Sequence, residues 1–254
     1  MAKSKKADSA EGPDKTAQAP ASGEAPHTLA IDVGGSHIKA SVLDRAGGFM
    51  TDRVRVVTPV GNPPDEFVEA IRHLVEPLPS FDRVSVGFPG VVRDGVVRTA
   101  PNLGNDRWKG FDLAGALSTH LGKPVRVLND ADMQGLGVIQ GHGLEMVVTL
   151  GTGFGTGVYM NGQLLPHLEI AHQAFRKGET FDEQLGNAAR KRVGDKKWSK
   201  RVKKAIADLR SLTNFDHLYL GGGNAKRITF EPDSDVTVIG NEAGIEGGVA
   251  AWHD

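Results

Sequence analysis

Residues 28–40 read TLAIDVGGSHIKA, an apolar β-like run that ends in an acid, two glycines and a serine before a second such run. The pattern predicts two strands joined by a glycine turn. Glycine has no Cβ, so it allows positive φ and lets backbone N–H groups approach an anion. Asp32 beside the turn is placed to hold Mg²⁺, which favours a few carboxylates together with substrate phosphate oxygens. A plain hairpin turn remains the alternative.

Two further glycine-rich turns follow apolar runs later in the chain. The second reads LGTGFGTG over residues 150–157, and the third reads LGGGN over residues 220–224. A hairpin needs one or two glycines, so four at alternating positions favour a phosphate cradle for the second turn. The third turn follows a strand and is expected to open a helix, whose N-terminus would face an anion or a nucleoside. A tight strand-to-helix connection is the alternative there.

The composition is typical of a globular protein. The 254 residues carry a formal net charge of −1, so no overall field favours nucleic acid or a membrane surface as a partner. The absence of cysteine excludes disulfides, thiolate zinc sites and cysteine nucleophiles, and it is typical of a cytoplasmic protein. No apolar run approaches the roughly 18 residues of a membrane span, so we expect no transmembrane helix.

The chain divides into a polar tail and two similar α/β halves. Residues 1–27 lack Val, Ile, Leu, Phe, Trp and Tyr, which predicts a disordered tail. We expect a small α/β domain over residues 28–129 plus 242–254, a large α/β domain over residues 130–241, and a ligand cleft between them. The expected strands are 28–33, 38–43, 49–57, 84–88, 125–128, 146–150, 157–160, 217–220 and 236–239. The expected helices are 65–76, 111–121, 181–192, 196–212 and 242–252.

Asn129 and Asp130 follow a short apolar strand and begin a helical pattern. A carboxylate at the end of that strand could accept the proton of an attacking hydroxyl, and phosphoryl transfer needs little else beyond alignment and charge neutralisation. Asp130 is therefore the candidate general base. A helix N-cap is the alternative role, because Asp is common at that position. Asp132 would point about 200° away around the helix.

Two other groups of residues attract attention. Glu169 and His172 would share one face of a helix and suit vicinal sugar hydroxyls, although an exposed pair would look the same. Residues 190–204 contain nine basic side chains against one acid, which a polyanion could bind with salt-dependent affinity. One helical face would carry Lys197, Lys200, Arg201 and Lys204. A solvated surface is the alternative, because an apolar side runs along the same segment.

Taken in order, the motifs resemble those of the ROK sugar kinases, members of the actin-like ATPase (ribonuclease H-like) superfamily. They run Asp-x-Gly-Gly-Ser, Pro-Gly, Pro-Asn, Asn-Asp-Ala, Leu-Gly-Thr-Gly-x-Gly, Glu-x-x-His and Leu-Gly-Gly-Gly across about residues 30–248. Residues 175–186, 190–204 and 214–226 are most similar to the polyphosphate/ATP glucokinases within that family. The resemblance implies two βββαβ-type halves with an interdomain cleft.

The resemblance also implies a function and a site. The protein would transfer a phosphoryl group from polyphosphate, ATP or both to the 6-hydroxyl of glucose, with Mg²⁺, without zinc, and as a homodimer. Asp130 would be the base. The sugar would be held by Asn105, Asn129, Asp130, Glu169, His172 and Asp182. The phosphates and the nucleotide would be held by Asp32, Gly34, Gly35, Ser36, Lys39, Gly151, Thr152, Gly153, Gly155, Gly222, Gly223 and Asn224.

This sequence departs from the family pattern in places. The usual Glu-Leu-Gly-His reads Glu-Ile-Ala-His over residues 169–172, so the methyl group of Ala171 could narrow the sugar site. The distal sugar-binding acid is usually Glu and here matches Asp182, or Glu183 after a shift of one residue. A kinase for mannose, fructose or an N-acetylhexosamine therefore stays open, as does a sugar-binding regulator without turnover.

Overall fold

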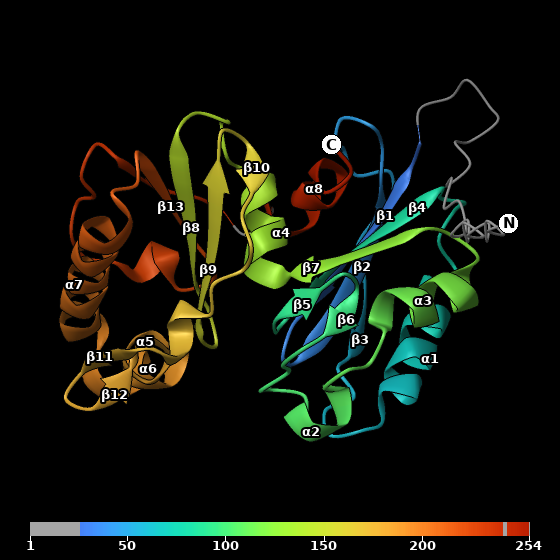
Figure 1. Ribbon diagram of the computed structural model, residues 1–254, viewed down its shortest axis with the longest axis horizontal. Coiled ribbons are helices and arrows are strands. Elements are labelled where there is room, and N and C mark those ends of the chain that lie inside the picture. The colour runs from blue at the N-terminus through green and yellow to red at the C-terminus, as the bar shows by residue number, and fades with distance from the viewer. Residues whose placement is uncertain (1–25, 241–242, 254) are drawn as a thin grey trace, which may run out of the picture.

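The computed structural model describes residues 26–240 and 243–253. All but the last two residues of the predicted disordered tail lie outside these ranges. The described chain forms two five-stranded sheets that lie side by side, each with its own helices (Figure 1). The sheets share one topology, in which three antiparallel strands are followed by two strands added in parallel on the other side of the first.

The first sheet has the strand order β3-β2-β1-β4-β7. Its strands are β1 (Thr28–Val33), β2 (His37–Leu43), β3 (Val54–Val57), β4 (Arg83–Phe88) and β7 (Val125–Asn129). The register pairs Asp32 with Gly87 and Phe88 with Asn129. The carboxyl ends of β1, β4 and β7 therefore meet at one edge, where ligands collect in open α/β sheets.

Helices cover both faces of this sheet. On one face lie α1 (Pro64–Val75) and α3 (Leu113–Leu121), and α1 buries Phe67, Val68 and Ile71 at helical spacing. The connection to α3 carries the small hairpin of β5 (Val92–Arg93) and β6 (Val96–Val97), then α2 (Asn105–Trp108). On the other face lies α8 (Ala243–Ala250), whose Ile245 and Val249 pack against Ala30 and Leu43.

The second sheet has the order β10-β9-β8-β13-β14. Its strands are β8 (Leu144–Leu150), β9 (Phe154–Met160), β10 (Gln163–Leu164), β13 (His217–Gly221) and β14 (Val236–Val238). The helices beside it are α5 (Phe181–Leu185), α6 (Asn187–Val193) and α7 (Asp195–Thr213), preceded by the hairpin of β11 (Ala174–Arg176) and β12 (Glu179–Thr180). Trp198 of α7 is fully buried in this second core, and its Nε1 donates to the carbonyl of Leu185 at 2.7 Å.

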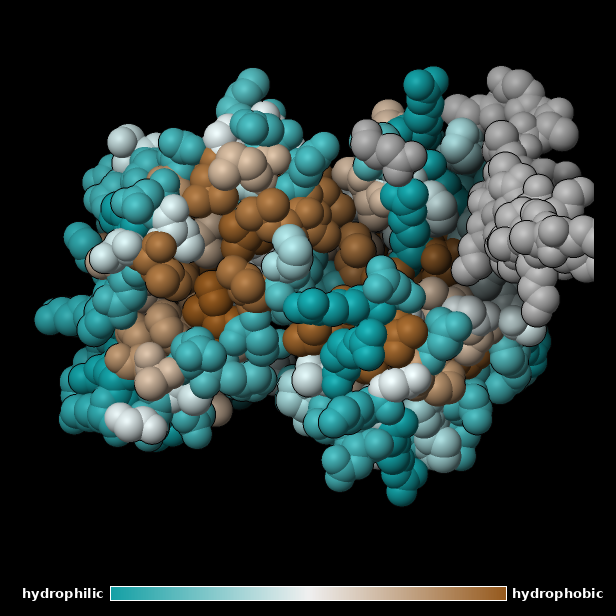
Figure 2. Space-filling model, viewed as in Figure 1, coloured by the Kyte–Doolittle hydropathy of each residue, from teal (hydrophilic) through white to brown (hydrophobic). Residues whose placement is uncertain are grey.

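Helix α4 (Asp130–Leu136) lies between the two halves and packs against β4 and β7 of the first sheet and β8 and β9 of the second. It also crosses α8. Apolar side chains gather over α4 and β10 in the view of Figure 2, where Leu136, Ile139 and Leu164 surround buried Tyr159. We propose that the domain boundaries follow this division, with residues 28–129 plus 242–254 as one domain and residues 130–241 as the other.

Two expected elements are interrupted in the structure. In the strand expected over 49–57, Phe49 forms only an isolated bridge with Leu43, and regular pairing begins at Val54. The pairing is interrupted because Thr51 accepts the hydroxyl of Ser41 at its carbonyl and the N–H of Val42 at its own hydroxyl. The helix expected over 181–192 is two helices broken at Gly186. A Cβ there would lie 2.6 Å from the carbonyl oxygen of Thr152.

The helices expected at two candidate sites are shorter than predicted. Residues 169–172 contain a single 3₁₀ turn, η1 (Ile170–His172), and the third glycine turn leads into another, η2 (Ala225–Arg227). Within the described ranges, no helix combines the length and the apolar character needed to cross a membrane.

Candidate active site

A cavity of about 220 Å³ lies between the two halves, at the edge where the strands of both sheets end. It is smaller than the roughly 300–1,000 Å³ typical of pockets for drug-sized ligands, so it suits a ligand the size of a monosaccharide. The predicted site residues that line it are Gly34, Gly35, Asn129, Asp130, Gly151, Thr152, Gly153, Gly155, Glu169, His172 and Asp182. Ala171, the departure noted in the sequence, also lines it.

Asp130 is the first residue of α4 and faces this cavity. The N-cap is Asn129, whose Oδ1 accepts the N–H of Ala131 at 2.8 Å and that of Asp132 at 3.3 Å. The amide nitrogen of Asn129 donates to the carbonyl of Gly90 at 3.1 Å. The capping role considered for Asp130 therefore belongs to its neighbour, and Asp130 makes one backbone contact, accepting the N–H of Ala131 at 2.9 Å.

The electrostatic surroundings of Asp130 favour its protonated form. Burial raises the pKa of Asp130 from 3.8 to about 7, and the negative charge of Asp32 adds to the effect, against the opposing N–H of Ala131. A carboxyl group with a pKa near neutrality is suited to accept a proton from a substrate hydroxyl. Perturbed carboxyl groups in clefts are also typical of functional sites.

The first glycine turn, residues 34–36, is held by Thr58. The hydroxyl of Thr58 donates to the carbonyl of Gly34 at 2.6 Å, and its N–H donates to the carbonyl of Ser36 at 3.0 Å. Gly34 and Gly35 line the cavity, whereas the predicted contacts Ser36 and Lys39 are exposed and lie outside its lining. Among the described residues, no atom lies within 4 Å of where a Cβ on Gly35 would sit, so this face of the turn is open.

The second glycine turn, residues 151–153, connects β8 and β9. Asp182 anchors it by accepting the N–H of Phe154 at 2.8 Å. A Cβ on Gly153 would collide with the carboxylate of Asp182. Gly155 and Gly157 lie within β9, where a Cβ would meet Ala131 or Tyr159. The excess of glycine at alternating positions thus has a structural reason that the sequence did not suggest, namely the close packing of β9 around α4.

The third glycine turn supports the second and does not line the cavity. Gly222 has φ +84°, and a Cβ there would lie within 2.7 Å of backbone atoms of Leu150. The side-chain amide of Asn224 donates to the carbonyl of Gly151 at 3.0 Å, and its backbone N–H donates to the carbonyl of Leu150 at 2.9 Å. Gly223 is exposed beside these contacts. The first and second turns line the cavity, and the third turn lies behind the second, which it contacts through Gly222 and Asn224.

The remaining predicted sugar contacts are only partly brought together. Glu169, His172 and Asp182 line the cavity together with Asp130, whereas Glu183 is engaged in a capping box with Thr180. Asn105 does not line the cavity, because its Oδ1 accepts the N–H of Ala100 at 2.8 Å. Asn102 lines it instead. The Pro101-Asn102 pair was present in the motif order and could have indicated this residue.

A buried charged pair lies directly behind the site. Nδ1 of His167 is 2.9 Å from Oδ2 of Asp132, and Nε2 of His167 is 3.7 Å from Oε2 of Glu169. Asp132 points away from the cavity, as expected from the helical geometry, but it connects back to Glu169 through His167. His167 carried no motif, so the sequence gave no indication of this role.

The basic segment forms a charged surface beside the second half. Lys197 and Lys200 are exposed on α7, whereas Lys204 pairs with Asp208 at 2.6 Å. Arg201 donates to the carbonyl of Gln184 at 3.2 Å. Its pKa is lowered, first by burial and then by the neighbouring positive charges of Arg176 and Arg192. The cationic cluster thus adds Arg176 of β11 and Arg192 of α6 to the helical face that carries Lys197, Lys200, Arg201 and Lys204.

A divalent cation could be held at the first turn together with a phosphorylated substrate. In residues 26–240 and 243–253, no group of three or more acidic or histidine side chains is arranged to hold a metal ion alone. Mg²⁺ is usually bound by one or two carboxylates, substrate phosphates and water. Asp32 fits this pattern. Its pKa is raised by burial, with Lys39 at 3.5 Å acting in the opposite direction.

Comparison with known proteins identifies the family. The chain matches the ROK family over residues 28–167. The chain belongs to this family. A polyphosphate glucokinase of Mycobacterium tuberculosis (strain CDC 1551 / Oshkosh) is 32% identical over 227 residues, which are 85% of this chain and 84% of that protein. An N-acetylmannosamine kinase of Salmonella newport (strain SL254) is 35% identical over 147 residues, 54% of this chain and 49% of that protein.

Solved structures extend the likeness to the fold. The crystal structure of an inorganic polyphosphate/ATP-glucomannokinase from Arthrobacter sp. strain KM has a TM-score of 0.79 and 30% sequence identity. The similarity covers 90% of this ROK chain and 100% of that one. The predicted two-domain actin-like ATPase fold is confirmed, and so is the prediction that this ROK protein is a sugar kinase.

Proposed function

We propose that this ROK sugar kinase transfers a phosphoryl group from polyphosphate, ATP or both to the 6-hydroxyl of D-glucose, with Asp130 as the general base. One observation carries the proposal. Half-buried Asp130, with its pKa near neutrality, faces a cavity lined by two glycine turns and by the polar side chains of Glu169, His172 and Asp182. A base, phosphate-binding backbone and hydroxyl-binding groups in one small cavity are the parts that phosphoryl transfer to a sugar requires.

In the proposed reaction the sugar is held between the polar wall and Asp130. Glu169 and Asp182 accept hydrogen bonds from sugar hydroxyls, and the 6-hydroxyl donates to the carboxylate of Asp130. As O6 attacks the terminal phosphorus, its proton passes to Asp130 and the bond to the rest of the donor breaks. Backbone N–H groups of the first and second turns face the phosphoryl oxygens. Mg²⁺ bound with the donor near Asp32 would neutralise the developing charge.

Other hexoses remain candidate acceptors, because the relatives include a glucomannokinase and an N-acetylmannosamine kinase by name. A coupled assay tests this. Glucose, mannose, fructose and N-acetylhexosamines are each offered with ATP and with polyphosphate, in buffers with and without Mg²⁺. Turnover of glucose with the highest kcat/KM supports the proposal. A higher kcat/KM with another hexose contradicts the acceptor, and sugar binding without turnover supports the regulator.

We further propose that the cationic cluster on α6 and α7 guides polyphosphate to the second turn. Lys197→Gln combined with Lys200→Gln should raise KM for polyphosphate roughly fivefold or more and leave KM for ATP unchanged, because polyanion binding scales with the cations it meets. These two lysines are chosen because Lys204 already pairs with Asp208 and Arg201 supports a backbone carbonyl. Lys109→Gln, an exposed lysine of the first half, is the matched control.

The effect on polyphosphate should weaken as ionic strength rises, because salt screens exposed charges. An equal rise in KM for both donors, or no use of polyphosphate by the unaltered protein, would contradict a role of the cluster in polyphosphate binding.

We also propose that the protein is a cytoplasmic homodimer, the assembly that the resemblance to the family implied. Light scattering coupled to size-exclusion chromatography measures the assembly directly.

A further inference from the structure

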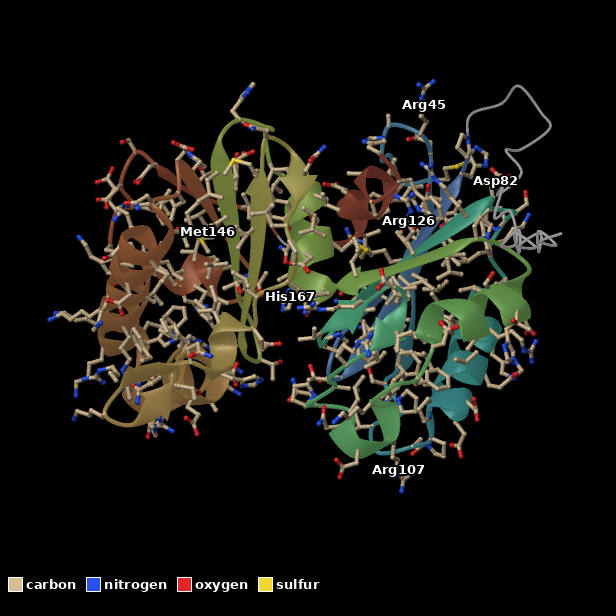
Figure 3. The ribbon with its side chains drawn as sticks, viewed as in Figure 1. Arg45, Asp82, Arg107, Arg126, Met146 and His167 are labelled. Atoms are coloured by element: carbon tan, nitrogen blue, oxygen red, sulfur yellow. The ribbon has the colours of Figure 1, made fainter. Side chains whose placement is uncertain are left out.

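His167 occupies an unusual position between the site and the core. It lies in the segment between β10 and η1 and is found at the middle of the molecule, between the two halves (Figure 3). Its side chain is 5% exposed, and that of Asp132 is 4% exposed. Glu169, on the other side of the ring, is 30% exposed because it lines the cavity. The imidazole is therefore the link between a buried carboxylate of α4 and a carboxylate of the site.

The ring carries a positive charge in this environment. Burial alone would lower the pKa of His167, but Asp132 and Glu169 outweigh it and raise that pKa to about 9. The charge lowers the pKa of Glu169, for which the His167 side chain is the largest cause. Asp132 has its pKa raised by burial, and His167 opposes that rise. One cation thus lowers the pKa of Glu169 and opposes the effect of burial on the pKa of Asp132.

The hydrogen bonding of this group is incomplete as it stands. Among the described residues, Nε2 of His167 and Oδ1 of Asp132 have no hydrogen-bond partner, although both are buried. A buried unpaired N–H is costly, so it favours any partner within reach. The nearest acid to Nε2 is Glu169 at 3.7 Å, and a small rotation of that side chain brings it to the roughly 3 Å of a hydrogen bond.

We propose that His167 is a positioning residue for the hexose site. Asp132 fixes the ring through Nδ1, and the Nε2–H of the ring holds the carboxylate of Glu169 turned into the cavity. Asp132 lies two residues after the base on the same helix, so Asp130 and Glu169, which both line the cavity, are held in one rigid arrangement. The inference rests on the proposed function, because it assigns Glu169 to the sugar.

Two substitutions of His167 test the contacts of the two ring nitrogens separately. The amide of His167→Asn can replace Nδ1 and keep the contact with Asp132, but it is too short to reach Glu169. The longer amide of His167→Gln reaches the position of Nε2. We expect His167→Asn to raise KM for the hexose about tenfold or more, the range for a hydrogen bond to a charged group, and to leave donor KM and kcat at saturating sugar within about twofold. His167→Gln should recover most of the loss.

His142→Asn is the matched control, because His142 is exposed at the start of the second sheet and away from the cavity. An unchanged hexose KM in His167→Asn overturns the inference. Equal losses in the Asn and Gln variants, with lowered melting temperatures and no separation of KM from kcat, also overturn it, because they indicate packing alone.

Direct sugar binding separates this inference from the proposed function. Glucose binding is measured by calorimetry for the unaltered protein and for both variants. Binding without turnover, weakened in His167→Asn and restored in His167→Gln, overturns the proposed function and supports the inference. Turnover with the same glucose affinity in all three proteins supports the proposed function and overturns the inference. An unaltered protein that neither binds nor phosphorylates any hexose overturns both.

Discussion

Asn129 and Asp130 divide two tasks between adjacent residues. Asn129 caps α4 and ties it to Gly90, while Asp130 faces the cavity with one backbone contact. Burial and the charge of Asp32 bring the pKa of Asp130 to about 7. At neutral pH this carboxyl group is thus near the middle of its titration, where a general base is most effective.

Asp130→Asn should lower kcat at least about 10²-fold, the usual low end for the loss of a general base, and should leave the fold intact. In the unaltered protein kcat should fall as pH falls below about 7, because the base becomes protonated. Steady-state kinetics at saturating substrates from pH 5 to 9 measure both effects. Asp106→Asn, an exposed acid of α2, is the control. More than about a tenth of the original kcat in Asp130→Asn would contradict the assignment.

The same substitution should stabilise the protein at high pH. The pKa of Asp130 is about 7 when folded and near 3.8 when unfolded, so the folded state binds more protons between these values. The free energy of unfolding therefore decreases as pH rises from about 4 to about 7, and Asn cannot ionise. Urea unfolding should show Asp130→Asn gaining on the order of a few kcal/mol relative to the unaltered protein between pH 5 and pH 8. Parallel changes in the two proteins would contradict the burial of the charge.

The sequence predicted the positions of some site residues and not of others. Asp32, Asp130 and the glycines of the first two turns were predicted together, because the ends of parallel strands meet at one edge of a sheet. Asn105 was predicted where Asn102 lines the cavity, and the left-handed backbone at Gly104, with φ +95°, lies between the two. The contact between His167 and Asp132 joins residues 35 positions apart, and neither carries a motif that points to the other.

At the scale of elements, the third glycine turn braces the second. Asn224→Ala removes the hydrogen bond to the carbonyl of Gly151 and should let the second turn move. Because any phosphoryl donor needs that turn, KM should rise for ATP and for polyphosphate by the same factor, roughly three- to tenfold for a loss of about 1 kcal/mol. Steady-state kinetics with both donors measure it. Asn62→Ala, on an exposed loop of the first half, is the control.

The outcome distinguishes bracing from nucleotide recognition. If Asn224→Ala raised KM for ATP alone, the residue would contact adenosine, as the family resemblance implied, and its bond to Gly151 would have no effect on polyphosphate. Such a result would contradict the bracing role.

Elements with a regular pattern were predicted well and those set by distant contacts were not. The expected helix over 196–212 corresponds to α7 within a residue at each end, because its apolar side repeats at helical spacing. The break between α5 and α6 depends on the carbonyl of Thr152, which approaches Gly186 from another part of the chain. The sequence around Gly186 does not indicate this contact with Thr152. The strand expected over 49–57 was too long for a similar reason, because Ser41 and Val42 bond Thr51 in place of regular strand pairing before Val54.

At the scale of the whole molecule, the two sheets are connected through two helices that cross. The chain enters the second half along α4 and returns to the first sheet along α8. The contact of α8 with the first sheet is supported at its end by Trp252, which donates to the hydroxyl of Ser85 of β4 at 2.8 Å and lies under Arg126 and Arg83. Because Asp130 is the first residue of α4, its position depends on how α4 packs against α8 between the two halves.

The crossing of α4 and α8 depends on the absence of a side chain at Gly247. A Cβ there would collide with the carbonyl oxygen of Met133 and lie 3.0 Å from the backbone nitrogen of Gly137. Backbone of a packed helix cannot yield as a flexible side chain can, so Gly247→Ala should lower the free energy of unfolding by about 1–3 kcal/mol. It should also lower kcat, because α4 moves with the base at its first residue.

Gly240→Ala is the matched control, because no described atom lies within 4 Å of its added Cβ. It should stay within about 0.5 kcal/mol of the unaltered protein. Urea unfolding and kcat with saturating glucose are measured on both variants. If Gly247→Ala is as stable and as active as Gly240→Ala, the packing of α8 against α4 does not need the close contact at Gly247. A loss of stability with kcat intact would mean that the joint holds the halves together without setting the position of Asp130.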